Sequence, residues 1–198
     1  GGVGHGVQSW MAQVGARRAS PLTLMAEYLP TLRALLAGES VTIDGRYVHL
    51  DDVTLDWPPT VAVPVFAAAE GPKTLDRAGA LADGTVIPSG WSPNRLRDAA
   101  LRVRAAAGER AETHPVVVYL PTRFADDAPA PADADTRERA SGSVVDVAET
   151  VEAFYAAGAT TVVLQPHTDE DDLIGFSHRS GEVARMLRIA PTREPRAR

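Results

Sequence analysis

The stretch Val61-Ala-Val-Pro-Val-Phe-Ala-Ala68 is followed by the turn Ala69-Glu70-Gly71-Pro72-Lys73 and by a helical pattern that ends near Asp83-Gly84. The apolar run predicts a buried strand over residues 61–68, and the next segment has apolar residues at helical spacing. The same strand-turn-helix unit recurs three times, with strands predicted at 85–88, 116–120 and 160–164. This alternation is typical of an α/β fold with a parallel sheet.

The remaining segments fit around these units. Ser20-Pro21 is a typical helix start, and the alternating residues 41–56 around Asp44-Gly45 predict a β-hairpin inserted at the surface. Residues 125–142, rich in Ala, Asp and Pro, predict a flexible loop. The acidic run 169–172 is expected in the first turn of the last helix, where it would complement the helix dipole. Residues 190–198 predict a disordered tail after one domain that spans 1–189.

The chain opens on Gly1-Gly2-Val3-Gly4-His5-Gly6, which resembles the end of a further strand. Counting it, the sequence contains about half of the eight strands of a TIM (β/α)₈ barrel. We therefore predict the C-terminal half of such a barrel with a β-hairpin insertion, and we expect natural sequence upstream of Gly1. Half a barrel leaves sheet edges uncovered, so either the missing half or a second copy, in a homodimer, is expected to cover them.

Composition narrows the range of partners. The 198 residues carry a formal net charge of −6, and this acidic balance argues against nucleic acid as a partner. The absence of Cys excludes disulfides and thiol nucleophiles. No apolar run approaches the length of a membrane span, so we predict a cytoplasmic protein without a membrane partner. Residues 169–172 lack the ligand spacing of a calcium loop, and no metal site is predicted.

Several separate motifs together resemble one known family. They are Gly4-His5-Gly6-Val7-Gln8-Ser9-Trp10-Met11, Ser20-Pro21-Leu22, Asp44-Gly45-Arg46-Tyr47, Trp57-Pro58-Pro59, Ala69-Glu70-Gly71-Pro72-Lys73 and Ala82-Asp83-Gly84. In order and spacing they resemble the C-terminal portion of the bacterial luciferase-like flavin or deazaflavin oxidoreductases, particularly the coenzyme F420-dependent branch. The resemblance covers residues 1 to about 189.

The resemblance implies a cofactor lying across the C-terminal ends of the strands. The backbone of Gly4, His5, Gly6 and Val7 would face it, and Gly71, Pro72 and Lys73 at a helix N-terminus suit a phosphate or an acidic tail. Without the resemblance, the glycine-rich turn also fits an ordinary connection from a strand to a loop, and Lys73 also fits an ordinary surface lysine. The family's catalytic residues lie on the first strands, which this sequence does not contain, so no catalytic residue is assigned.

The resemblance implies an oxidoreductase that transfers a hydride between F420 and an organic small-molecule substrate. An FMN-dependent luciferase-like monooxygenase is the alternative, and a non-catalytic flavin-binding shortened barrel or an inactive fragment are further ones. His49, His114 and His178 are expected to be solvated or capping residues. His167 follows the last strand at the face where barrel enzymes keep their sites, and it is the histidine most suited to line a pocket.

Overall fold

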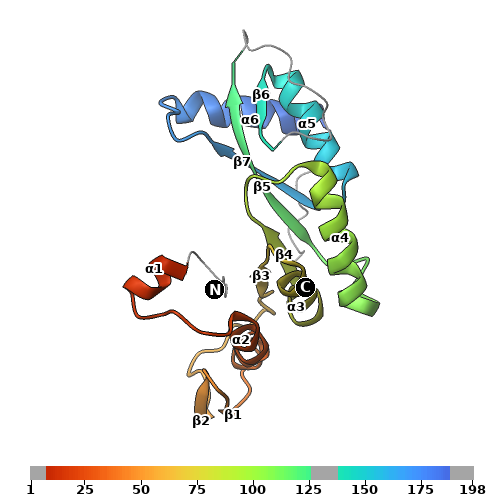
Figure 1. The fold of residues 1–198 in the computed structure, drawn as a ribbon. Coiled ribbons are helices and arrows are strands. Elements are labelled where there is room, and N and C mark those ends of the chain that lie inside the picture. Colours follow the sequence, from red (N-terminus) through yellow and green to blue (C-terminus); the bar gives the residue numbers. More distant parts are fainter. Residues whose placement is uncertain (1–7, 126–137, 188–198) are drawn as a thin grey trace. The chain divides into compact units, whose positions relative to one another are not determined.

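The computed structural model describes residues 8–125 and 138–187, which form two compact units. The first unit consists of the chain up to Pro88 together with Asp98–Val117, and the second consists of Ser89–Arg97 and the chain from Val118 onward. Figure 1 labels the elements along the chain. The predicted residues Gly4, His5, Gly6 and Val7 lie outside the described residues.

The first unit begins with α1 (Gln8–Gln13) and α2 (Pro21–Leu36). The side chain of Ser20 caps α2 by accepting a hydrogen bond from the N–H of Thr23, with Pro21 at the first helical position. The predicted hairpin is confirmed as the antiparallel pair β1 (Val41–Asp44) and β2 (His49–Val53), in which Asp44 lies opposite His49.

A parallel strand pair follows in the same unit. β3 (Phe66–Ala68) pairs with β4 (Gly84–Ile87), and α3 (Pro72–Leu81) connects them. The prediction of a buried strand over 61–68 was wrong in its first half. Residues 61–64 are exposed and do not form a strand, and the strand starts only at Phe66. Pro64 has no N–H to donate to a ladder, so the β-branched residues before it do not extend the strand.

Three further elements follow β4 along the chain. α4 (Pro93–Ala107) is followed by a single 3₁₀ turn, η1 (Gly108–Arg110), and then by β5 (Val116–Phe124). Within the first unit, the N–H of Thr85 in β4 donates to the carbonyl of Pro115, just before β5 (2.8 Å). β5 is four residues longer than the predicted strand 116–120, and its extension carries Thr122 and Arg123.

The second unit is built on the C-terminal part of β5. It pairs in parallel with β6 (Ala140–Gly142), with Thr122 opposite Ala140, and it also pairs with β7 (Thr161–Pro166). The predicted loop over 125–142 is too long at its C-terminal end, because residues 140–142 form the strand β6. The helices α5 (Val144–Ala156) and α6 (Leu173–Met186) complete the unit, which buries Leu120, Val147, Val151 and Phe154.

The acidic run before α6 corrects a third prediction. α6 begins only at Leu173, so residues 169–171 belong to the preceding loop and not to the first helical turn. Asp172 is the N-cap, whose carboxylate accepts a hydrogen bond from the N–H of Gly175 (2.8 Å). The other acidic residues are therefore available for contacts outside the helix.

The observed fold is α/β with parallel strand pairs, which confirms the predicted class and agrees with half of a (β/α)₈ barrel. Within residues 8–125 and 138–187, the helices are too short or too polar to traverse a lipid bilayer.

Candidate functional site

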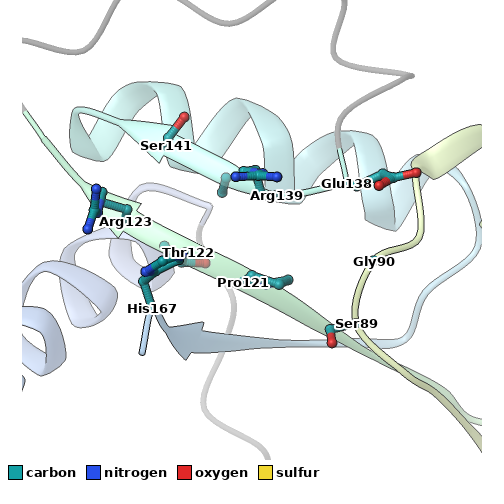
Figure 2. Close-up of a pocket in the computed structure, with 10 residues that line it drawn as sticks. Ser89, Gly90, Pro121, Thr122, Arg123, Glu138, Arg139, Ser141 and His167 are labelled. Carbon is teal, nitrogen blue, oxygen red and sulfur yellow. The ribbon is translucent and has the colours of Figure 1, made fainter. Parts of the chain in front are cut away.

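A cavity of about 470 Å³ opens in the second unit where its strands end. β5 contributes Thr122 and Arg123, and His167 follows β7 directly (Figure 2). Ser89 and Gly90 come from the loop after β4. The remaining lining residues are Pro121, Glu138, Arg139, Ala140 and Ser141. Loops at the C-terminal ends of parallel strands are where α/β folds place their ligands.

Thr122 holds the centre of this edge together. Its side chain is buried, and its hydroxyl donates to the carbonyl of Leu120 (2.9 Å). Its own carbonyl accepts the backbone N–H of His167 (3.2 Å). The position of His167 is thus fixed by the backbone of the neighbouring strand rather than by a free loop.

Asp169 connects the two basic residues of the cavity. One carboxylate oxygen contacts Nδ1 of His167, and the other accepts from the guanidinium of Arg123. The pKa of Asp169 is lowered to about 2, first by Arg123 and then by His167. The same pair raises the pKa of Arg123. Asp169 is therefore a carboxylate at neutral pH and can only accept hydrogen bonds.

This arrangement decides which nitrogen of His167 carries the proton. Because Asp169 only accepts, Nδ1 of a neutral His167 must be the protonated nitrogen. Nε2 is then the basic nitrogen, and it has no hydrogen-bond partner within the described parts of the chain. A histidine held in this way can take up or release a proton at Nε2.

The structure places the predicted residues as follows. His167 lines the cavity, as proposed from its position after the last strand, and Ser89 and Gly90 line it as well. Gly71 caps α3, Pro72 is its first residue, and Lys73 is exposed in its first turn, all in the first unit.

Two interpretations of the sequence need correction or addition. His114 is not solvated: it is 2% exposed, and its Nε2 lies 2.9 Å from the hydroxyl of Thr85. Arg123 and Asp169 were missed as site residues. The alternation of β5 continues through residue 123, and following it further would have placed Arg123 at the strand end, whereas no local pattern marks Asp169 as its partner.

Comparison with known proteins decides the family. A model of the luciferase-like monooxygenase family matches residues 2–186. The chain belongs to this family. The predicted resemblance is thereby confirmed over nearly the whole chain.

The chain is also similar to enzymes that are named for their activity. A 5,10-methylenetetrahydromethanopterin reductase of Methanolobus tindarius is 31% identical over 166 residues, which are 84% of this chain and 47% of the relative. An F420-dependent glucose-6-phosphate dehydrogenase of Beutenbergia cavernae is 44% identical over 64 residues, which are 32% of this chain and 19% of the relative. The chain spans about half the length of the methylenetetrahydromethanopterin reductases that it matches.

A solved structure shares the fold. The coenzyme F420-dependent tetrahydromethanopterin reductase of Methanopyrus kandleri superposes with a TM-score of 0.70 at 16% identity, covering 91% of this chain and 71% of that one. At this identity the likeness concerns the fold alone. It supports the barrel-type α/β architecture deduced from the strand-helix units.

Proposed function

We propose that this protein is an F420-dependent oxidoreductase that transfers a hydride between the deazaflavin and an organic small-molecule substrate. The observation that carries the proposal is that several curated relatives are named F420-dependent dehydrogenases, including one from Beutenbergia cavernae and one from Nakamurella multipartita. We place this activity in the cytoplasm, as expected from the sequence.

The residues present fit an anionic cofactor. Gly71 caps the ten-residue helix α3, and a Cβ there would meet only the hydroxyl of Thr74, at 3.8 Å, so the backbone can be approached closely. The N-terminus of a helix attracts phosphate and carboxylate groups, and Lys73 adds a full positive charge in the same turn. We propose that Gly71, Pro72 and Lys73 hold the phosphate or acidic tail of F420.

A side chain of the neighbouring helix stabilises this turn. Nε of Arg102 donates to the carbonyl of Pro72 (3.0 Å), and the guanidinium forms an ion pair with Asp76. Because Arg102 is committed to these two groups, Lys73 is the cation of this turn that we assign to the cofactor. The turn after Gly4, His5, Gly6 and Val7 remains the second proposed contact, through its backbone.

The bound cofactor would supply the hydride acceptor or donor. We assign to His167 the proton that accompanies the hydride: in oxidation of an alcohol, Nε2 would accept the hydroxyl proton, and in reduction it would return it. Asp169 positions the imidazole by accepting from Nδ1, and Arg123 keeps Asp169 ionised.

The cofactor is tested by titrating F420, and separately FMN, into the chain while following absorbance and fluorescence. We expect F420 to bind more tightly. Lys73→Ala should weaken binding severalfold at low salt, and the loss should shrink at high salt because an exposed charge contact is screened. Arg77→Ala, an exposed basic residue on the same helix, is the matched control and should leave the affinity unchanged.

The alternatives give different results. Tighter binding of FMN would favour the FMN-dependent monooxygenase. Binding of a flavin or deazaflavin without any hydride transfer across a panel of alcohols and aldehydes would favour the non-catalytic binder. Equal losses in Lys73→Ala and Arg77→Ala would refute the assignment of Lys73.

A further inference from the structure

A second cavity of about 470 Å³ lies entirely in the first unit, where it is lined by residues of α1, of α2, of the segment between them and of the hairpin β1–β2. Figure 1 labels these elements. Its volume falls within the range of small-molecule sites. The proposed cofactor contacts at Gly71, Pro72 and Lys73 do not line it. The lining residues are Met11, Ala16, Arg18, Leu24, Tyr28, Thr31, Leu32, Leu35, Tyr47, Val48, His49 and Leu50.

The walls of this cavity are largely apolar. Leu24, Tyr28, Leu32 and Leu35 follow one another at spacings of three or four residues, so they form one stripe along α2. This stripe differs from the one that contains Met25 and Leu29, which are fully buried in the core of the unit. α2 therefore presents a second apolar surface, which the core does not cover and on which Tyr28 is 39% exposed.

Polar contacts hold the facing wall, which is the loop between β1 and β2, in place. The carboxylate of Glu27 accepts the backbone N–H groups of Arg46, Tyr47 and Val48 at 2.9, 2.8 and 3.1 Å. The hydroxyl of Tyr47 accepts the N–H of Ser20 (3.0 Å). These bonds fasten the hairpin loop to α2 at a fixed distance, so the apolar faces do not collapse onto each other and the cavity is preformed.

Among the described residues, one full charge lines this cavity, and it is positive. Arg18 uses one guanidinium nitrogen for the carbonyls of Gly15 (3.3 Å) and Arg17 (3.1 Å), and its guanidinium carbon lies 6.0 Å from the ring centroid of Tyr47. Its other N–H donors have no partner within the described residues. The lining residues that the structure describes include no carboxylate, and the nearby Glu27 already accepts three N–H groups.

We propose that this cavity binds an amphipathic carboxylic acid, with its apolar chain along the stripe on α2 and its carboxylate on Arg18. Charge complementarity selects the head group, because an apolar chamber with one uncompensated guanidinium favours an anion over an alcohol or an amine. The apolar walls select the tail, since burying each methylene is favourable. This site is independent of the proposed F420 chemistry.

The test uses decanoate, decanol and decylamine as probes, titrated into the 198-residue chain and followed by calorimetry. Decanoate should bind best. Arg18→Gln should weaken decanoate binding about tenfold and leave decanol unchanged, because a charge-assisted hydrogen bond contributes only to the acid. Arg17→Gln is the matched control: Arg17 is the exposed neighbour, does not line the cavity, and its replacement should change neither affinity.

A steric variant tests the position of the tail. Leu32→Trp should fill the chamber and abolish binding of both decanoate and decanol, with an unchanged circular dichroism spectrum as evidence of folding. The proposal is overturned if decanoate and decanol bind equally, if neither binds, or if Arg17→Gln and Arg18→Gln lose affinity equally. It is also overturned if Leu32→Trp dissociates a dimer of the chain, because a second copy would then be the occupant. A chain that fails to bind F420 but passes this test refutes only the proposed function.

Discussion

Replacing Gly79 with Ala should destabilise the protein although Ala is the better helix former. Gly79 lies in α3, and a Cβ built on it would sit 2.3 Å from the carbonyl oxygen of Val103 and 2.9 Å from Cβ of Ala106, both on α4. Ordinary contacts of a Cβ begin at 3.4 Å, so the two helices would have to separate by about 1 Å. The obstructing atom is a backbone carbonyl, which cannot rotate away as a side chain can.

The magnitude follows from two opposing effects. Ala gains about 1 kcal/mol over Gly in a helix interior. Overpacking a tight contact costs about 1–3 kcal/mol. Because the clash is with backbone, we take the upper part of that range and expect a net loss of about 1–2 kcal/mol in the free energy of unfolding.

Gly181→Ala is the matched control. Gly181 lies inside α6, where an added Cβ would meet only the guanidinium of Arg185, at 3.6 Å. There the helix propensity acts alone, and we expect a gain of about 0.5–1 kcal/mol. Urea unfolding followed by far-UV circular dichroism measures both. If Gly79→Ala were as stabilising as Gly181→Ala, the close approach of α3 and α4 at this point would be wrong.

Three further predictions concern titratable side chains. Burial and neighbouring positive charge lower the pKa of His114, so on acidification the unfolded chain takes up a proton before the folded protein does. The free energy of unfolding should therefore fall as the pH drops below about 6.5. His114→Gln should flatten this pH dependence in urea titrations between pH 5 and 8. The backbone N–H groups of residues 46–48 lower the pKa of Glu27. Glu27→Gln should therefore speed amide hydrogen exchange at residues 46–48 at neutral pH. In the parent protein these N–H groups should lose their protection only in acid, as the pH falls through that lowered pKa. Asp169→Asn should remove the preference of His167 for a proton on Nδ1, which ¹⁵N NMR reports directly; an unchanged tautomer ratio would show that Asp169 does not position the ring.

The order of strands and helices was predictable because the signals for each element lie in residues that are neighbours in the sequence. Ser20-Pro21 starts a helix by capping chemistry that depends only on neighbouring residues, and the observed cap agrees. The hairpin was predictable for the same reason, since Asp44-Gly45 and the alternation around it are local. The start of β3 is also marked locally, by Pro64, which has no N–H to donate to a ladder, but the apolar run before it predicts a strand that begins earlier.

Contacts between distant residues set the limit of sequence reasoning at the candidate site. The position of His167 after β7 follows from the strand-helix pattern, but its partner does not. Asp169 belongs to an acidic run that also suits a helix start, and only the observed start of α6 at Leu173 frees it for Arg123, 46 residues earlier. His114 shows the converse: its burial depends on Thr85, which lies 29 residues away in the chain.

The two cavities differ in charge, and this difference separates the ligands they suit. Around His167 the cations Arg123 and Arg139 are matched by Glu138, which lines the same cavity, and by Asp169 beside it. An anionic substrate group would gain little there, because it would compete with Asp169 for Arg123. For the proposed function, this balance favours an uncharged hydroxyl or carbonyl next to Nε2, which is the kind of group that exchanges a proton during hydride transfer. In the cavity of the first unit, by contrast, no carboxylate among the described lining residues balances the charge of Arg18, and the proposed acid gains the full contact.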